Sequence, residues 1–151
     1  MSVLLAAIAE HARNRGDSPA LNDGVRTLSY RDLDAAIAET ARTLDRLLPG
    51  EGPVALKADN SVAWILIDLA FIAMERPLVP IPAFFTPEQQ SHALQDAGAA
   101  ALIADSATGR DEIAFGIAGA PLRLTVLAGG NAVVPPLTAK ITYTSGTTGH
   151  P

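Results

Sequence analysis

Residues 53–81, PVALKADNSVAWILIDLAFIAMERPLVPI, decide the fold class. Two short apolar runs, 54–58 and 78–81, flank a longer apolar run at 64–74. Short apolar runs bounded by polar residues and proline are typical of buried strands, whereas the longer run is typical of a core helix. Asp59 and Asn60 precede that helix as expected caps, and Pro77 follows it. Asp68 interrupts the run, which is also too short to cross a bilayer.

The alternation continues toward the C-terminus. Thr86 is the expected N-cap of a second helix, with Pro87 at its first position, Gln89 completing a capping box and Gly98 ending it. Further strands are predicted at 100–104, 122–127 and 140–144, with a weaker helix over 106–118 and a loop over 128–139. We therefore predict an α/β fold with a mostly parallel sheet and helices on both faces.

The N-terminal third carries helical and turn signals. Ser2 is the expected N-cap of a first amphipathic helix, and the start of the chain lacks the basic residues of a signal peptide. Asp23-Gly24 between two short runs predicts a small hairpin. Ser29 then begins a helix that ends at Pro49-Gly50.

Composition limits the possible partners. The 151 residues have a net charge of −5 and a sequence pI of about 5.0, and Lys and Arg form no run, so no nucleic-acid partner is expected. The absence of cysteine excludes disulfides and thiol chemistry and favours a cytoplasmic location. Hydrophobic residues make up 48% of the chain. We expect an exposed apolar surface, with Phe84, Phe85 and residues 133–137 as contributors, and hence self-association.

Residues 143–151, YTSGTTGHP, carry the chemistry. Four hydroxyl side chains and two glycines lie within 144–149, a composition that suits a polyphosphate because glycines let backbone N–H groups turn inward and hydroxyls add donors. An ordinary polar loop is the alternative. A P-loop would need a Gly-Lys pair, which the chain lacks, and the GXXG loop of a KH domain would need a basic surface.

The pattern Tyr-Thr-Ser-Gly-Thr-Thr-Gly-x-Pro resembles the AMP-binding signature of the adenylate-forming superfamily, which includes acyl-CoA synthetases, luciferases and nonribosomal adenylation domains. Residues 17–21, 26–33, 78–82 and 94–99 resemble stretches of the same superfamily, in the same order. In that family a Lys-Gly pair follows the proline. The resemblance implies that residues 1–151 are an incomplete N-terminal AMP-binding domain, truncated within the phosphate-binding loop.

The resemblance also implies an activity. It is closest to acyl-CoA synthetases, so we expect the parent protein to be an ATP-dependent carboxylate–CoA ligase. Such an enzyme activates a small-molecule carboxylic acid, here expected to be a fatty acid, as an acyl-adenylate and transfers it to coenzyme A, with ATP, Mg²⁺ and CoA as cofactors. The residues implied to bind the β- and γ-phosphates are Thr144, Ser145, Gly146, Thr147, Thr148 and Gly149.

No catalytic residue or metal ligand is assigned within the chain, which alone is expected to be inactive. An amino-acid adenylation domain and a non-catalytic nucleotide-binding or interaction module remain as alternatives. His11, His92 and His150 are far apart, which favours surface or packing roles over metal binding. Lys57 is interpreted as a solvated strand end.

Overall fold

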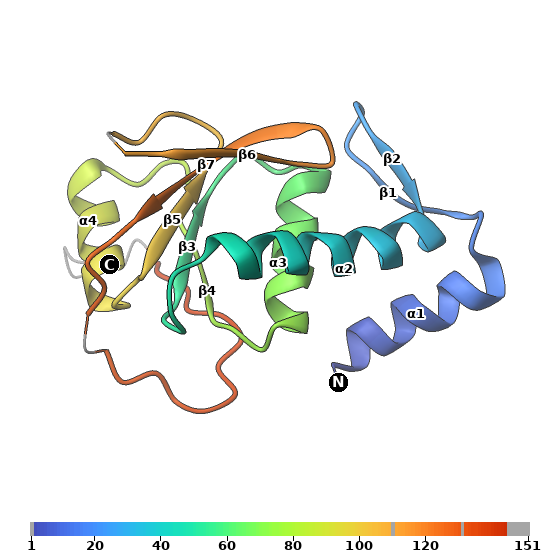
Figure 1. The fold of residues 1–151 in the computed structure, drawn as a ribbon, viewed down its shortest axis with the longest axis horizontal. Helices are drawn as coiled ribbons and strands as arrows, with labels where there is room; N and C mark the ends of the chain where they lie inside the picture. Colours follow the sequence, from blue (N-terminus) through green and yellow to red (C-terminus); the bar gives the residue numbers. More distant parts are fainter. Residues whose placement is uncertain (1, 110, 131, 145–151) are drawn as a thin grey trace. The chain divides into compact units, whose positions relative to one another are not determined.

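The computed structural model describes residues 2–109, 111–130 and 132–144, which form two compact units (Figure 1). The first unit consists of residues 1–47, 60–74 and 117–120. The second consists of residues 48–59, 75–116 and 121–151. The chain thus passes between the units several times, and each is described by itself.

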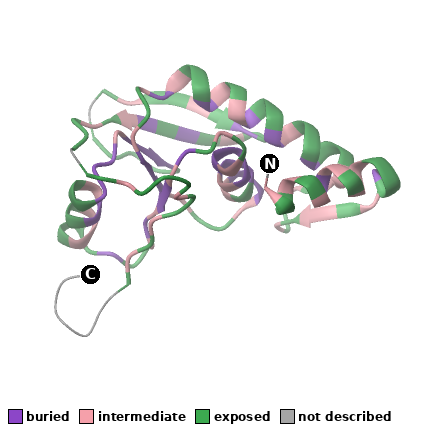
Figure 2. Cartoon of the chain, turned by 90° about the horizontal axis from the view of Figure 1, so that it is seen from below, coloured by how far each residue is buried: buried purple, intermediate pink, exposed green. Residues whose placement is uncertain are grey.

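The first unit is built around helix packing. It holds α1 (Val3–Arg15), the antiparallel pair β1 (Pro19–Asn22) and β2 (Thr27–Ser29), α2 (Tyr30–Leu47) and α3 (Val62–Ala73), with α2 packed against both other helices. The buried residues of α2 are Leu33, Ile37, Thr40 and Leu44, whose spacing of three and four places them on one side of the helix (Figure 2). The Ser2 cap, the hairpin and the Ser29 start are confirmed.

The start of α3 differs from the prediction. Its N-cap is Ser61, whose hydroxyl accepts from Trp64 N at 3.1 Å, rather than Asp59 or Asn60. A second acceptor comes from the hairpin turn, because the Asp23 carboxylate accepts from Val62 N at 2.9 Å. The same carboxylate also accepts from Val25 N and Arg26 N. The hydrogen bond from Val62 is the largest of the effects that lower the pKa of Asp23 to about 2.

The second unit is an α/β layer. Its elements are β3 (Val54–Lys57), β4 (Leu78–Pro80), α4 (Pro87–Asp96) and β5 (Ala101–Ala104), and its sheet also includes β6 (Ile113–Ile117) and β7 (Ala120–Val126). The strand order is β4-β3-β5-β7-β6. β3 pairs in parallel with β4 and β5, whereas β5 and β7 are antiparallel. The α/β class is confirmed, with a mixed sheet.

Helix α4 packs on one face of this sheet. Thr86 and Gln89 form the predicted capping box, and the helix ends before Gly98, whose φ is +59°. Ala93 and Ala97 lie in one buried cluster with residues of β3, β4 and β5, namely Ala55, Val79 and Leu102. The residues that alternate with these in the strands, Val54, Leu56, Leu78 and Ile103, are buried as well, so neither face of the three parallel strands is open to water.

Two predicted elements are wrong. The helix predicted over 106–118 is not formed there: Ile113–Ile117 are strand β6, because Ile113, Phe115 and Ile117 alternate with the period of a strand. Ala118 and Gly119 (φ 48° and 76°) then turn the chain back into β7. The predicted strand over 140–144 is reduced to a single parallel bridge between Lys140 and Leu78.

The expected apolar surface is found in part. Phe84 is 71% exposed, and Val133 and Leu137 are 94% and 95% exposed. Phe85 does not belong to this surface, because it is 5% exposed and packs in the cluster beneath α4. Self-association through this surface stays a prediction.

Candidate functional site

The backbone just before the hydroxyl-rich segment, at residues 139–141, is hydrogen-bonded to β4. Leu78 N donates to Ala139 O at 3.1 Å, and Ile141 N donates to Leu78 O at 2.9 Å. Of the residues predicted to bind phosphate, the structure describes Thr144, which is exposed. The other five, Ser145, Gly146, Thr147, Thr148 and Gly149, lie outside the described residues.

Tyr143 joins this segment to α4. Its ring and Ile141 pack against the buried cluster of α4 and the parallel strands. Its hydroxyl donates to Asp96 Oδ2 at 2.6 Å, and Asp96 is the last residue of α4. Burial, followed by the hydrogen bond to Asp96, raises the pKa of Tyr143 well above its usual range, so the hydroxyl keeps its proton and remains a donor.

The C-terminal end of α4 also meets the loop that leads to Tyr143. At Gly98, a Cβ atom would lie 2.9 Å from Ala132 Cβ and 3.2 Å from Gly130 O. At Gly130, a Cβ atom would lie 3.1 Å from Gly98 Cα. Glycine at 98 therefore serves two purposes, because it allows a positive φ and leaves room for the incoming backbone.

A cavity of about 230 Å³ lies between these segments. Its walls come from Asp96 and Ala97 of α4, from the loop at 132–138, and from Ile141 and Tyr143. Apolar side chains predominate, and the polar part of the wall comes from the Tyr143–Asp96 pair and from Thr138. The space is small, and its chemistry suits packing rather than recognition of a charged ligand.

A second cavity, of about 340 Å³, lies where β3 and β5 end. Lys57 is the last residue of β3, as expected of a strand end, and it is half-buried, with Nζ donating to Gln90 Oε1 at 2.7 Å. The hydroxyl-bearing residues of the wall are Ser91, Ser106 and Thr108. An ammonium group with hydroxyls around it can hold an anion.

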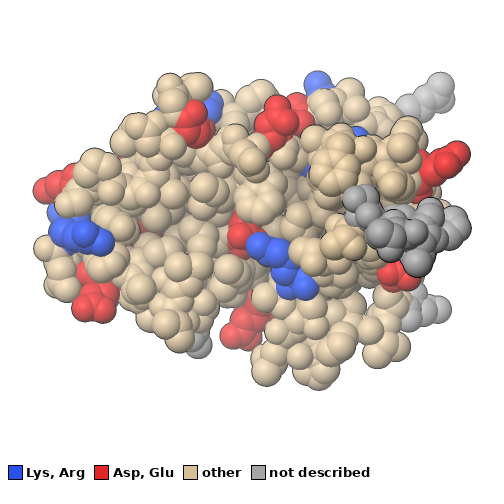
Figure 3. All heavy atoms as spheres, turned by 180° about the vertical axis from the view of Figure 1, so that it is seen from behind, with Lys and Arg blue, Asp and Glu red and all other residues tan. Residues whose placement is uncertain are grey.

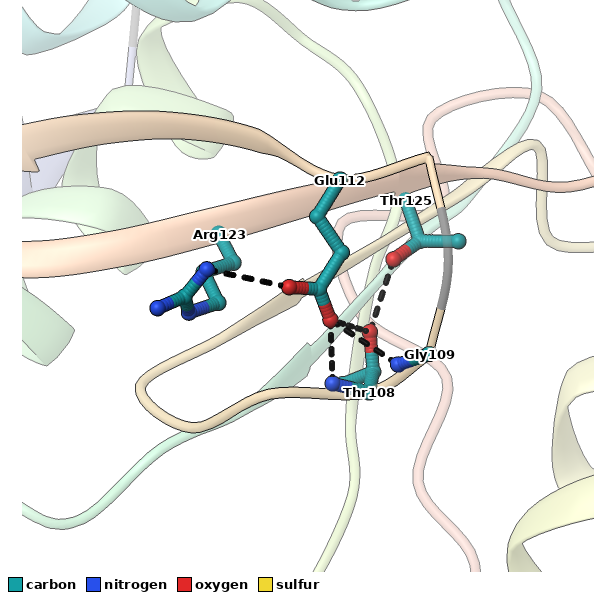
Figure 4. A network of polar contacts seen from close by, with 5 residues as sticks. All are labelled: Thr108, Gly109, Glu112, Arg123 and Thr125. Atoms are coloured by element: carbon teal, nitrogen blue, oxygen red, sulfur yellow. Dashed lines mark hydrogen bonds and ion pairs between the residues drawn. The ribbon is translucent and has the colours of Figure 1, made fainter.

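One wall of this second cavity is fixed by a polar network (Figure 4). The Glu112 carboxylate accepts from Thr108 N and Oγ1, from Gly109 N at 2.9 Å and from Arg123 Nη1 at 3.1 Å. The Thr108 and Thr125 hydroxyls are 2.7 Å apart. The hydrogen bond from Thr108 N is the largest of the effects that lower the pKa of Glu112. The Glu112 carboxylate therefore fixes the position of Thr108 in the cavity wall, and Glu112 does not itself line the cavity.

On the face in Figure 3, Lys and Arg side chains are few and form no extended basic patch. Among residues 2–109, 111–130 and 132–144, no group of three or more His, Cys, Asp or Glu side chains could hold a metal ion. None of the described helices is both long and apolar enough to span a membrane.

Sequence reasoning missed the neighbours of Tyr143. In the sequence, Gly98 indicates only the end of the helix, and Asp96 carries no role of its own. The available signal was a helix that ends in Asp-Ala-Gly, since glycine after a helix marks a positive φ. That signal shows where the helix ends, but it cannot show that Tyr143, 47 residues later, contacts the same helix end.

Nearly the whole chain matches one known protein family. The family described as "AMP-binding enzyme" matches residues 8–151. The chain therefore belongs to the AMP-binding enzyme family, whose members form adenylates from ATP, typically with Mg²⁺.

Two curated proteins are similar to the chain. Surfactin synthase subunit 3 of Bacillus subtilis is 31% identical over 144 residues, which cover 89% of this chain and 11% of that protein. The phosphinothricin tripeptide synthetase PhsC of Streptomyces viridochromogenes is 28% identical over 159 residues, covering 98% of this chain and 15% of that protein. The chain thus spans less than a sixth of the length of either relative.

Solved structures share the fold. The N-terminal subdomain of Klebsiella oxytoca NpsA has a TM-score of 0.63 at 24% identity, covering 72% of this chain and 29% of that one. A holo four-domain nonribosomal peptide synthetase bound to AMP and glycine has a TM-score of 0.61 at 27% identity, covering 70% and 8%. The anthranilate CoA ligase AuaEII in complex with anthranoyl-AMP has a TM-score of 0.60 at 19% identity, covering 66% and 20%.

Proposed function

We propose that the protein containing this chain activates an amino acid with ATP and passes the aminoacyl group to the thiol of a carrier protein. The observation that carries the proposal is the similarity to a nonribosomal peptide synthetase that holds AMP and glycine. The curated relatives at 31% and 28% identity, a surfactin synthase subunit and a tripeptide synthetase, point the same way.

The proposed reaction has two steps. A carboxylate oxygen attacks the α-phosphorus of ATP, and the bond to the β-phosphate oxygen breaks to release pyrophosphate. The carrier thiolate then attacks the acyl carbon, and the bond to AMP breaks. Residues 144–149 are proposed to bind the β- and γ-phosphates and so to position the leaving pyrophosphate, with a role that is electrostatic rather than acid–base.

A substrate panel tests the proposal. The protein is incubated with ATP, Mg²⁺, hydroxylamine and single acids, either amino acids or fatty and aryl acids, and hydroxamate formation reports the adenylate. We expect one or a few amino acids to give hydroxamate, and the labelled aminoacyl group to move to a carrier protein bearing a phosphopantetheine arm. Turnover confined to fatty or aryl acids would reject the amino-acid proposal while keeping adenylation.

A carboxylate–CoA ligase is the second candidate. It is favoured by the cavity beside Lys57, because an ammonium group and hydroxyls suit a phosphate, and CoA carries several. If CoA is the acceptor, Lys57→Ala should raise KM for CoA about tenfold and leave KM for ATP unchanged. Arg42→Ala, which removes an exposed cation on α2, is the matched control. Absence of any CoA-dependent release of AMP would remove this candidate.

A further inference from the structure

Tyr143 precedes the proposed phosphate-binding residues directly, and its side chain contacts α4 in two ways. Its ring lies against Ile141 and the α4 cluster, and its hydroxyl reaches Asp96 Oδ2 at 2.6 Å. A hydroxyl–carboxylate hydrogen bond of this length is in the range of charge-assisted bonds, which are stronger than those between neutral groups. The position of the ring is therefore set by packing and by one polar contact together.

Main-chain contacts hold the residues before it. Leu78 accepts from Ile141 N and donates to Ala139 O, so the backbone at 139–141 is tied to β4. Gly130 and Ala132 lie against Gly98, two residues beyond Asp96. The segment thus contacts α4, β4 and the turn after α4 at three places, and the Tyr143–Asp96 contact is the last before Thr144.

From this arrangement we propose that Asp96 is a positioning residue for nucleotide binding, acting through the Tyr143 hydroxyl to hold the start of the phosphate-binding segment at Thr144. This inference rests on the proposed role of residues 144–149 in binding the phosphates of ATP. Asp96 touches neither substrate nor reacting atoms in this proposal. Its effect is to reduce the freedom of a segment that would otherwise have to be ordered when ATP binds.

Kinetics of three variants test the proposal in the protein that contains the chain. Tyr143→Phe keeps the packed ring and removes the donor, Asp96→Ala removes the acceptor, and Asp96→Asn keeps an amide oxygen that can accept. We expect the first two to raise KM for ATP about tenfold, with KM for the carboxylic acid unchanged and kcat within about twofold. Asp96→Asn should stay close to wild type.

A double variant separates positioning from general weakening. If the two residues act through one bond, Tyr143→Phe combined with Asp96→Ala should raise KM for ATP about tenfold, as each single change does, rather than about a hundredfold. Glu88→Ala, which removes another exposed carboxylate of α4, is the matched control and should leave KM for ATP unchanged.

The outcomes for the two proposals differ. An active wild-type protein whose variants lose kcat, or lose affinity for both substrates equally, would overturn the positioning role and leave adenylation intact. Multiplicative effects in the double variant would overturn it as well. A wild-type protein that shows no acid-dependent turnover and no ATP binding by calorimetry would reject both proposals.

Discussion

The carboxylate of Asp23, in a hairpin turn, accepts a hydrogen bond at 2.9 Å from the amide of Val62, the first residue of α3. The first amides of a helix have no partner within it, so a side chain from another part of the chain completes the cap. The contact fixes the start of α3 to the β1–β2 hairpin within the first unit.

Acid should weaken this cap. The folded-state pKa of Asp23 is lowered from 3.8 to about 2, so its stabilising effect is present above about pH 4 and is lost as the pH falls toward 2. We expect Asp23→Ala to lower the unfolding temperature at pH 7, and the difference from wild type to shrink as the pH approaches 2. Circular dichroism melts across this range measure it. Asp34→Ala, an exposed carboxylate on α2, is the control, and an equal pH dependence in both variants would contradict the prediction.

Gly98→Ala should destabilise the second unit. The alanine would have to keep a positive φ of 59°, and its methyl group would lie 2.9 Å from Ala132 Cβ. We therefore expect a loss of about 2–3 kcal/mol in the free energy of unfolding. Gly24→Ala also has a positive φ, but nothing lies within 4 Å of its Cβ position, and it should cost about 1 kcal/mol. Equal losses in urea denaturation would show that the close approach at Gly98 has no energetic effect.

Thr86→Ala should cost about 1 kcal/mol of stability, because it removes the hydroxyl that accepts from Gln89 N at 3.2 Å. Thr86→Ser retains that oxygen and should remain within about 0.5 kcal/mol of wild type. Urea denaturation of the two variants provides the comparison. A serine variant as unstable as the alanine variant would mean that packing of the threonine methyl group, rather than the cap, matters at this position.

The Tyr143 hydroxyl should lose its proton at a higher pH than an ordinary tyrosine does. Burial and the Asp96 hydrogen bond raise its pKa, so the stability that the neutral hydroxyl contributes is fully present below about pH 10 and is lost as the pH rises through the folded-state value. The absorbance change at 295 nm that Tyr143→Phe removes should therefore occur well above pH 10, and Asp96→Ala should move it to lower pH. If the change that Tyr143→Phe removes were centred near pH 10, the placement of the ring would be contradicted.

Local signals predicted much of this fold because they act over a few residues. The Thr86–Gln89 capping box, the Ser29 helix start and the parallel strands at 54–57 and 101–104 all follow from adjacent residues. The prediction is wrong at 106–118, where glycines weaken both patterns and the alternation of Ile113, Phe115 and Ile117 is too short to outweigh the helical signals. At 140–144, strand propensity was outweighed by tertiary contacts, because Tyr143 packs against the cluster at α4.

The candidate site was less predictable than the fold. The hydroxyl-glycine pattern of residues 144–149 is visible in the sequence and lies within the family match at residues 8–151. The contacts that support this segment join residues that are far apart in the chain, such as Leu78 with Ile141 and Asp96 with Tyr143. Contacts between distant residues depend on the strand order, and periodicity within one segment carries no information about that order.

Acid-dependent exchange of labelled pyrophosphate into ATP is the most direct test of the central claim, that the protein forms adenylates and binds ATP phosphates through residues 144–149. The protein containing this chain should catalyse exchange with its acid. Gly146→Val and Thr147→Ala should reduce exchange by about tenfold or more without changing the unfolding temperature, because they remove backbone room and one donor from the proposed loop. Thr142→Ala, an exposed hydroxyl just before Tyr143, is the control and should retain exchange. Exchange at the wild-type level in both loop variants would contradict the account.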